Sequence, residues 1–375
     1  MIKRRLENII INELKSNKVL IIYGPRQVGK TTILNSIFKN KKVLWINGDN
    51  IEERTKMEWQ SANRFSSFMK NQNYLVVDEA QRIENIGLNL KIIHDQLKIT
   101  IVATGSSSFD LANKINEPLT GRKFEHLLFP FSFEELADEY GVFEEMKNLP
   151  VRLIFGGYPD VVLNEGKQIP ILQNLTSGYL YKDILEWNKI KNSKKLLNLL
   201  QAIAFQIGNE VSYNELAQLV GINKGTVESY IDLLEKSFVI FTLHSFSRNH
   251  RNELKKSKKI YFYDNGIRNT LINNFNPPEL RSDTGALWEN YIISERIKFT
   301  EYKQIYSNRY FWRTKYKQEI DYIEERDGKL FAYEFKWHKH KKAKIPKSFI
   351  AAYPDAETRI ITPENYIEFI TESNK

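Results

Sequence analysis

The chain has 375 residues, of which 42% are hydrophobic and 27% are charged, and its formal net charge is +9. This length exceeds what one hydrophobic core supports, so we expect two or three domains. The absence of cysteine excludes disulfides, thiolate metal sites and thiol catalysis. No apolar run reaches the ~18 residues of a membrane span, and the N-terminal residues predict an amphipathic helix rather than a signal peptide. We therefore expect a cytoplasmic protein without a membrane partner.

The first motif follows an apolar run, residues 19–23, which predicts a buried strand. The residues after it fit GxxxxGK[ST], the pattern of a phosphate-binding P-loop. Glycines at both ends let the loop turn, so that backbone N–H groups and the dipole of the next helix face one anion. The lysine is expected to reach the β- and γ-phosphates, and the first threonine to offer its hydroxyl to Mg²⁺. The predicted ATP-binding residues are Gly24, Pro25, Arg26, Gln27, Val28, Gly29, Lys30, Thr31 and Thr32.

Two acids, Asp78 and Glu79, end a second short apolar strand at residues 74–77. In nucleotide hydrolases a first carboxylate at such a position holds Mg²⁺ and a second orients the attacking water. We assign these roles to Asp78 and Glu79, against the alternative of a solvent-facing strand end. Thr104, which ends another apolar run, is expected to sense the γ-phosphate. Arg122 is a candidate arginine finger, completing the site of a neighbouring subunit in a homo-oligomer, or else a solvated loop residue.

Residues 1–135 alternate between strands and helices, with strands expected near 18–23, 43–47, 74–78, 98–104 and 124–129. This alternation predicts an α/β fold with a parallel sheet covered on both faces. Ser132 and Glu135 fit a capping box that starts a new helix. The following segment, residues 136–194, reads as helical and is expected to form a lid over the nucleotide.

Residues 195–263 predict a winged helix. A capped helix at 211–220, a tight turn at 221–223 and a helix at 224–237 have helix-turn-helix spacing. Strands at 238–243 and 260–263 flank a basic stretch that includes Lys255, Lys256, Lys258 and Lys259. Together with the net positive charge, this stretch favours a nucleic-acid partner, most simply DNA. The alternative is a packing module whose basic loop is only solvated.

The last segment predicts a β-hairpin, because residues 313–322 and 329–337 flank the turn Asp327-Gly328. A tight turn sets Asp321 opposite Glu334, with Glu319 and Lys336 on the same face. We expect the other face to be a core face: Ile320, Tyr322, Phe331, Tyr333 and Phe335. Two facing carboxylates repel each other unless a cation lies between them, and Mg²⁺ is the obvious candidate.

Several motifs together resemble, in order, those of a prokaryotic family of AAA-type ATPases: Gly-Pro-Arg-Gln-Val-Gly-Lys-Thr-Thr, Asp-Glu-Ala-Gln, Thr-Gly-Ser-Ser, Leu-Thr-Gly-Arg, Pro-Phe-Ser-Phe-Glu-Glu and Gly-Gly-Tyr-Pro. In that family the ATPase is fused to a C-terminal domain similar to PD-(D/E)XK nucleases. The resemblance implies a restriction-endonuclease-like α/β domain at 264–375. Asp321 and Glu334 would be its metal ligands, Glu289 an additional acid, and Lys336 the lysine beside the attacking water.

The sequence therefore predicts an ATPase core at 1–135, a helical lid, a winged helix and a nuclease-like domain. The nucleotide state of the core would control a DNA-binding and possibly Mg²⁺-dependent nuclease module. In the alternative, Lys336 merely neutralises the acids of a polar hairpin face. The protein would then be a nucleotide-switched ATPase that binds DNA or a protein partner without cutting.

Overall fold

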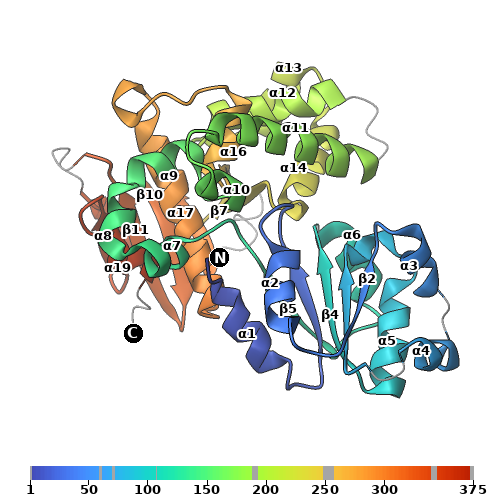
Figure 1. The fold of residues 1–375 in the computed structure, drawn as a ribbon. Helices are drawn as coiled ribbons and strands as arrows, with labels where there is room; N and C mark the ends of the chain where they lie inside the picture. Colours follow the sequence, from blue (N-terminus) through green and yellow to red (C-terminus); the bar gives the residue numbers. More distant parts are fainter. Residues whose placement is uncertain are drawn as a thin grey trace. The chain divides into compact units, whose positions relative to one another are not determined.

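The computed structural model describes residues 2–58, 61–69, 72–106, 108–187, 193–247, 257–338 and 344–371. The chain forms two compact units (Figure 1). The first contains Met1–Phe131 and Lys236–Phe238, and the second contains Ser132–Glu235 and Val239–Lys375. The division after residue 131 falls close to the predicted end of the ATPase core. The boundaries expected after 194 and 263 lie inside the second unit and stay predictions.

A parallel sheet in the order β2-β3-β4-β1-β5 forms the centre of the first unit. All five residues of β1 are buried, as expected for the central strand of a sheet covered on both faces. The strands are β1 Val19–Tyr23, β2 Val43–Asn47, β3 Tyr74–Asp78, β4 Thr100–Gly105 and β5 Lys123–Leu127. The helices are α1 Arg5–Glu13, α2 Lys30–Phe38, α3 Ile51–Lys56, α4 Ala62–Phe68, η1 Ala80–Arg82, α5 Ile86–Leu97 and α6 Ser108–Ile115. The predicted parallel α/β sheet is confirmed.

The second unit begins with helices, as the sequence predicts. Ser132 and Glu135 form the expected capping box at the start of α7. The first helices are α7 Phe133–Tyr140, α8 Val142–Lys147, α9 Leu149–Phe155, α10 Pro159–Leu163, α11 Gln168–Trp187 and α12 Ser193–Phe205. Helices α9 and α11 pack against α16, Asn265–Leu271, so this segment shares its packing with later parts of the chain. Its function as a lid stays a prediction. No helix in the described ranges has the length and apolarity needed to span a membrane.

A seven-stranded sheet in the order β12-β11-β10-β9-β7-β8-β6 runs through the second unit. Helices α13 Tyr213–Val220 and α14 Lys224–Lys236 lie where the helix-turn-helix was expected, with Gly221 left-handed at the turn. The strands are β6 Glu210–Val211, β7 Ile240–Ser245, β8 Lys258–Phe262, β9 Asn308–Arg313, β10 Glu319–Arg326, β11 Lys329–Phe335 and β12 Glu357–Ile361. The two strands of the expected wing thus belong to the same sheet as the C-terminal hairpin. A separate winged-helix domain stays a prediction.

Helices cover both faces of this sheet. On one face Tyr322 and Tyr333 contact Phe369 of α19, Tyr366–Thr371, and α17, Thr284–Tyr302, contributes a buried arginine. On the other face Trp312 packs against Phe349 of α18, Lys347–Ala352. The remaining element is η2, Pro278–Leu280, which precedes α17.

The predicted register of the C-terminal hairpin is confirmed. Arg326 pairs with Lys329 and Tyr322 with Tyr333, and Asp321 and Glu334 are the residues next to this last pair of the ladder. Asp327 and Gly328 both have positive φ, at 50° and 72°, as a type I′ turn requires. The expected first strand was too long, however. β9 ends at Arg313 and β10 starts at Glu319, because residues 314–318 form a turn with a left-handed Lys317.

The expected core face of the hairpin also needs a correction. A β-bulge between Ile320 and Ile323 inserts one extra residue of β10 opposite β9. The alternation of side chains therefore shifts, and Ile320 packs with Ile323 and Phe349 on the face opposite Tyr322. Asp321 lies in this bulge, so the period-two alternation of side chains does not predict the face of the sheet on which it lies.

Candidate functional site

The P-loop has the expected conformation. Gly24 and Gly29 have φ of 152° and 97°, and a Cβ at Gly24 would collide with the carbonyl oxygen of Leu128. Gln27 is also left-handed, at 61°, which fits a loop whose N–H groups converge. Lys30 is buried, and its Nζ donates to the carbonyl oxygens of Gly24 and Pro25 at 2.8 and 2.9 Å. The ammonium group therefore lies inside the loop, where phosphates would be expected.

Three of the predicted residues meet beside this loop. Thr31 Oγ1 donates to Asp78 Oδ2 at 2.7 Å, and the hydroxyl of Thr104 donates to the other oxygen of the same carboxylate. The structure thus brings together the ends of β3 and β4 with the first turn of α2. Both of these donors are uncharged hydroxyls, so they do not supply the positive charge that a cation would bring to Asp78.

Glu79 adjoins this cluster and is held in its own network. Its backbone is left-handed, with φ of 50°, a conformation that costs a non-glycine residue about 1 kcal/mol. Its N–H donates to Thr104 Oγ1 at 3.2 Å. Its carboxylate accepts hydrogen bonds from Gln81 at 2.6 Å and from Ser106 at 3.2 Å. Sequence reasoning did not assign a role to Gln81 or Ser106, although both lie in the quoted motifs.

Arg122 lies away from the P-loop of its own chain. Its carbonyl oxygen accepts from the N–H of Val19, at the start of β1, whereas the P-loop follows the end of that strand. A five-residue strand spans roughly 15 Å, so the guanidinium cannot serve this site. It is paired instead with Asp95 at 2.9 Å. A role as arginine finger therefore requires a second subunit and stays a prediction.

Arg4 is a residue that sequence reasoning missed. It precedes α1 and is buried, and its guanidinium donates to the carbonyl oxygens of Val28 and Phe129, each at 2.5 Å. It also stacks over the ring of Phe131 at 4.7 Å. These contacts join the P-loop to the segment that follows β5. No local pattern signals such a role, because Arg4 lies far from both partners in the sequence.

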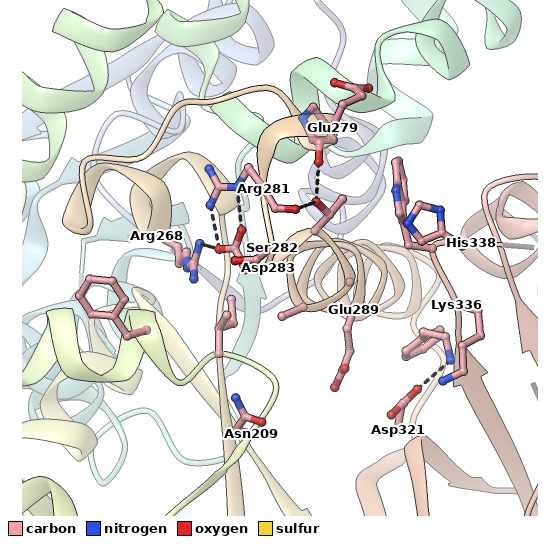
Figure 2. Close-up of a pocket in the computed structure, with 18 residues that line it drawn as sticks. Asn209, Arg268, Glu279, Arg281, Ser282, Asp283, Glu289, Asp321, Lys336 and His338 are labelled. Carbon is pink, nitrogen blue, oxygen red and sulfur yellow. Dashed lines mark hydrogen bonds and ion pairs between the residues drawn. The ribbon is translucent and has the colours of Figure 1, made fainter. Parts of the chain in front are cut away.

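The second unit contains a cavity of about 670 Å³ at the start of α17. Figure 2 shows Glu289 of α17 and Asp321 of β10 pointing into it, with Lys336 beside Asp321. The neighbouring Asp283 is turned toward Arg268 and Arg281, which bind its carboxylate at 2.5 and 2.8 Å. Three of the four residues expected from the nuclease resemblance, Glu289, Asp321 and Lys336, therefore line one cavity.

Glu334 precedes Phe335 and Lys336, which line this cavity. Burial, followed by the charge of Asp321, raises the pKa of Glu334 to about 7. Burial also raises the pKa of Asp321 itself. Lys336 binds one oxygen of Glu334 at 2.6 Å, whereas the other, Oε2, is buried without a hydrogen-bond donor among the described residues.

Lysine 259 was expected to contact DNA, and this expectation is wrong. Its side chain is 1% exposed, and its ammonium group binds Glu289 at 3.2 Å and also Glu319. Burial opposes the charge, yet neighbouring groups, Glu289 foremost, keep the pKa of Lys259 well above its ordinary value. Lys258 lies 4.6 Å over the ring of Tyr213. Lys255 and Lys256 lie outside the described residues.

The exposed side of the helix-turn-helix gives no support to a nucleic-acid partner. The exposed charged residues of α14 are Lys224, Glu228 and Asp232, and Lys224 is paired with Glu228 at 3.4 Å. Phosphate contacts need an excess of positive charge, which this helix lacks. DNA binding through α14 therefore stays a prediction.

The predicted set of three metal-binding acids is not assembled as a centre. Within the part of the chain that the structure describes, no three His, Asp or Glu side chains are grouped to hold a metal ion. Glu289 accepts from Tyr261 at 2.5 Å and from Lys259, and both of these donors come from β8. What remains of the predicted set is the pair Asp321 and Glu334.

Comparisons with known proteins agree with the geometry of the first unit. Residues 16–137 match the family model of an AAA domain. Residues 146–278 and 284–373 match two domains of unknown function, DUF8612 and DUF4143.

Similarities to whole proteins extend over both units. An uncharacterised protein of Methanocaldococcus jannaschii is 26% identical over 338 residues, which is 83% of this chain and 73% of the relative. An uncharacterised protein of Haemophilus influenzae is 23% identical over 281 residues, which is 68% of this chain and 69% of the relative. Among solved structures, a Walker-type ATPase of Pyrococcus abyssi matches with a TM-score of 0.51 at 17% identity, covering 72% of this chain and 96% of that chain. The sheet order, the P-loop and the family match together identify residues 16–137 as a P-loop ATPase domain of the AAA type.

Proposed function

We propose that the first unit binds ATP with Mg²⁺ and hydrolyses it, and that the bound nucleotide controls how the second unit engages a partner. The observation that carries the first part is the set of hydrogen bonds joining Thr31, Asp78 and Thr104 beside the P-loop. These bonds gather hydroxyl and carboxylate oxygens at the place where the γ-phosphate of a P-loop ligand would lie.

Mg²⁺ fits this corner. A hydroxyl and a carboxylate oxygen 2.7 Å apart are hard ligands of the kind that Mg²⁺ takes while keeping several waters. Thr31 would bind it directly and Asp78 through water. When bound, the ion neutralises charge on the phosphates.

The chain's own residues account for the remaining steps. Lys30 would exchange its two carbonyl partners for phosphate oxygens, and the N–H groups of the loop residues other than Pro25 would surround the β-phosphate. Glu79 would orient the attacking water, held in position by Gln81 and Ser106. Thr104 would report the γ-phosphate to both acids, because it contacts Asp78 and the N–H of Glu79.

Steady-state phosphate release and ATP binding test this proposal. Glu79→Gln should bind ATP normally and hydrolyse it about 10²–10⁴-fold more slowly, since water activation contributes that much. Glu84→Gln, an exposed acid of the same loop, is the matched control and should leave the rate unchanged. Undiminished hydrolysis by Glu79→Gln would remove this residue from the proposed role.

Phosphodiester cleavage by the second unit is a second candidate function. It is supported by the pair Asp321 and Glu334, by the unpartnered Oε2 of Glu334, and by Lys336 beside them. Mg²⁺ fits a site of two carboxylates because it is commonly held by one or two such groups together with substrate phosphates. Lys336 would then stabilise the charge that develops on the phosphate.

Incubation of the chain with Mg²⁺ and with DNA and RNA substrates tests this second candidate. Asp321→Asn and Lys336→Ala should each abolish cleavage and leave ATP hydrolysis intact. Glu325→Gln, near the turn of the hairpin, should cleave normally. If the unaltered chain leaves every substrate intact, the alternative predicted from the sequence takes its place: a nucleotide-switched protein that binds nucleic acid or another protein without cutting.

A further inference from the structure

A buried lysine, Lys259, lies within an acidic cluster of the second unit. This acidic cluster consists of Glu289, Glu319, Asp321 and Glu334. Lys259 belongs to β8, whereas its partners Glu289 and Glu319 belong to α17 and β10. The lysine side chain is 1% exposed, so water cannot screen its charge from these carboxylates. Three elements that are distant in the sequence thus meet around one ammonium group.

The contacts of Glu289 show which side of the cluster this ammonium group occupies. Glu289 Oε1 accepts from Lys259 at 3.2 Å and from the hydroxyl of Tyr261 at 2.5 Å. Lys259 and Tyr261 lie two residues apart on β8, so both side chains reach the cluster from the same face of that strand. In Figure 2, Glu289 and Asp321 lie on opposite sides of the space between α17 and β10.

The other side of the cluster is arranged differently. Asp321 Oδ2 accepts from the N–H of Phe335 at 2.8 Å, and Glu334 Oε1 accepts from Lys336. Glu334 Oε2 has no donor among the described residues. Lys336 is 29% exposed, so it is able to turn away toward a substrate, which the enclosed Lys259 is not.

We propose that Lys259 is a resident counter-ion that occupies the Glu289 side of this cluster, so that the cluster has room for one divalent cation, at Asp321 and Glu334, and not for two. Lys259 is then a positioning residue. It removes Glu289 from the set of metal ligands by supplying the positive charge that a second ion would bring. The inference rests on the proposed cation site of the second unit and adds its stoichiometry.

Mn²⁺ binding to the full chain, followed by electron paramagnetic resonance without nucleotide, tests the proposal. An Asp78→Asn background removes the cation site of the first unit. This background should bind one Mn²⁺. Glu289→Gln added to it should still bind one, and Glu334→Gln should bind none. Lys259→Met should bind two, and Glu289→Gln added to Lys259→Met should return the number to one.

Lys258→Met is the matched control, because it removes the adjacent lysine of the same strand, which lies over Tyr213. Loss of Mn²⁺ on Glu289→Gln, or two ions in the background protein, would overturn the proposal. So would a Lys259→Met protein that folds, by circular dichroism, without gaining an ion. If Lys259→Met does not fold, Lys259→Gln replaces it in the same measurement. If neither variant folds, the number of ions bound by Glu289→Gln decides the proposal.

The test separates this inference from the cleavage proposal. A background protein that binds no Mn²⁺ contradicts the cation site and therefore the cleavage. A gain of one Glu289-dependent ion on Lys259→Met would still establish Lys259 as the counter-ion. Conversely, loss of the single ion on Glu289→Gln contradicts the role of Lys259 and leaves the cation site standing.

Discussion

The two units compensate their acidic residues in different ways. In the first, Asp78 accepts hydrogen bonds from the hydroxyls of Thr31 and Thr104, which carry no charge. In the second, Glu289 is bound by Lys259, a buried lysine of the same chain. A hydroxyl leaves a carboxylate with its full charge and hence with affinity for an external cation, whereas a buried ammonium group satisfies that charge from within. An acidic motif alone therefore does not establish a metal site; the source of the opposite charge decides.

Removal of Lys30 tests the first side of this comparison and should have the largest effect. Its ammonium group is expected to make two charge-assisted hydrogen bonds to phosphates, each contributing about 1.5–3 kcal/mol. Lys30→Ala should therefore weaken ATP binding by about 10²–10⁴-fold in calorimetry. Lys39→Ala, an exposed lysine next to the same helix, is the control. Equal affinity of the two variants would show that the loop does not use Lys30 for phosphate.

Replacement of Arg122 tests whether a second subunit supplies an arginine side chain to the ATP site of the first unit. If Arg122 is a finger in trans, Arg122→Ala should bind ATP normally and hydrolyse it about 10³-fold more slowly. Mixing it with Glu79→Gln should restore part of the rate. Asp95→Asn removes only the intrachain partner of Arg122 and should keep the activity. A chain that is monomeric at every concentration, with a rate linear in protein, would contradict the role.

A fully buried ion pair sharpens the second side of the comparison. Arg296 binds Glu324 through two hydrogen bonds of 2.7 and 2.8 Å, and both side chains are 0% exposed. Arg296→Met removes both of these hydrogen bonds and leaves the buried Glu324 with a longer contact to Arg326, at 3.5 Å, so it should lower the free energy of unfolding by about 3–5 kcal/mol. Arg309→Met breaks a more exposed pair with Glu301 and should cost at most about 1 kcal/mol. Urea denaturation measures both, and equal losses would refute the argument from burial.

The pH dependence of stability reports how completely the lysines neutralise the second cluster. The pKa of Glu289 is raised from 4.5 to about 7, because burial outweighs its contact with Lys259. The folded state therefore binds the proton of the Glu289 carboxyl group more tightly than the unfolded state does. The resulting contribution to the free energy of unfolding is complete below pH 4.5 and is lost as the pH rises to 7.

Glu289→Gln should remove this dependence. Between pH 5 and 7 the slope of the unfolding free energy should become less negative by up to about 1.4 kcal/mol per pH unit. Denaturation curves at several pH values measure the slope. Glu279→Gln, an exposed acid at the same cavity, should leave the slope unchanged. An unaltered slope in Glu289→Gln would mean that Lys259 already neutralises this acid in full.

Lys258 should give the smallest effect. If it contacts a phosphate, Lys258→Ala should reduce the slope of log affinity against log salt for DNA by about 0.9. If its position over Tyr213 is purely structural, binding should not change. Binding isotherms at several salt concentrations distinguish these outcomes, and Lys224→Ala on α14 serves as the comparison.

The first unit was largely predictable because its signals are local. Four of its five strands, β1 to β4, are short and mainly apolar runs, and each observed strand lies within two residues of its predicted limits. The P-loop and the acids Asp78 and Glu79 follow directly from strand ends. Arg4 could not be found in this way, because its partners Val28 and Phe129 are brought to it only by folding.

The second unit was predictable only in part, for a physical reason. The turn Asp327-Gly328 fixes the hairpin register, so the match of Asp321 with Glu334 could be deduced by counting. The bulge at Asp321 could not be, because an inserted residue depends on the partner strand. The burial of Lys259 was equally inaccessible, since a lysine in a basic stretch normally faces solvent.

The sheet of the second unit has a mechanical consequence. β7 is bonded to β8 on one side and, in parallel, to β9 on the other, and the N–H of Phe246 extends this contact to Phe311. Because β7 is hydrogen-bonded to a strand on each side, β7 and β8 cannot rotate out of the sheet unless backbone hydrogen bonds break. Any displacement of β7 and β8 must therefore move Lys259 together with its ion-pair partners Glu289 and Glu319. Movement of this hairpin and rearrangement of the acidic cluster would then be a single event.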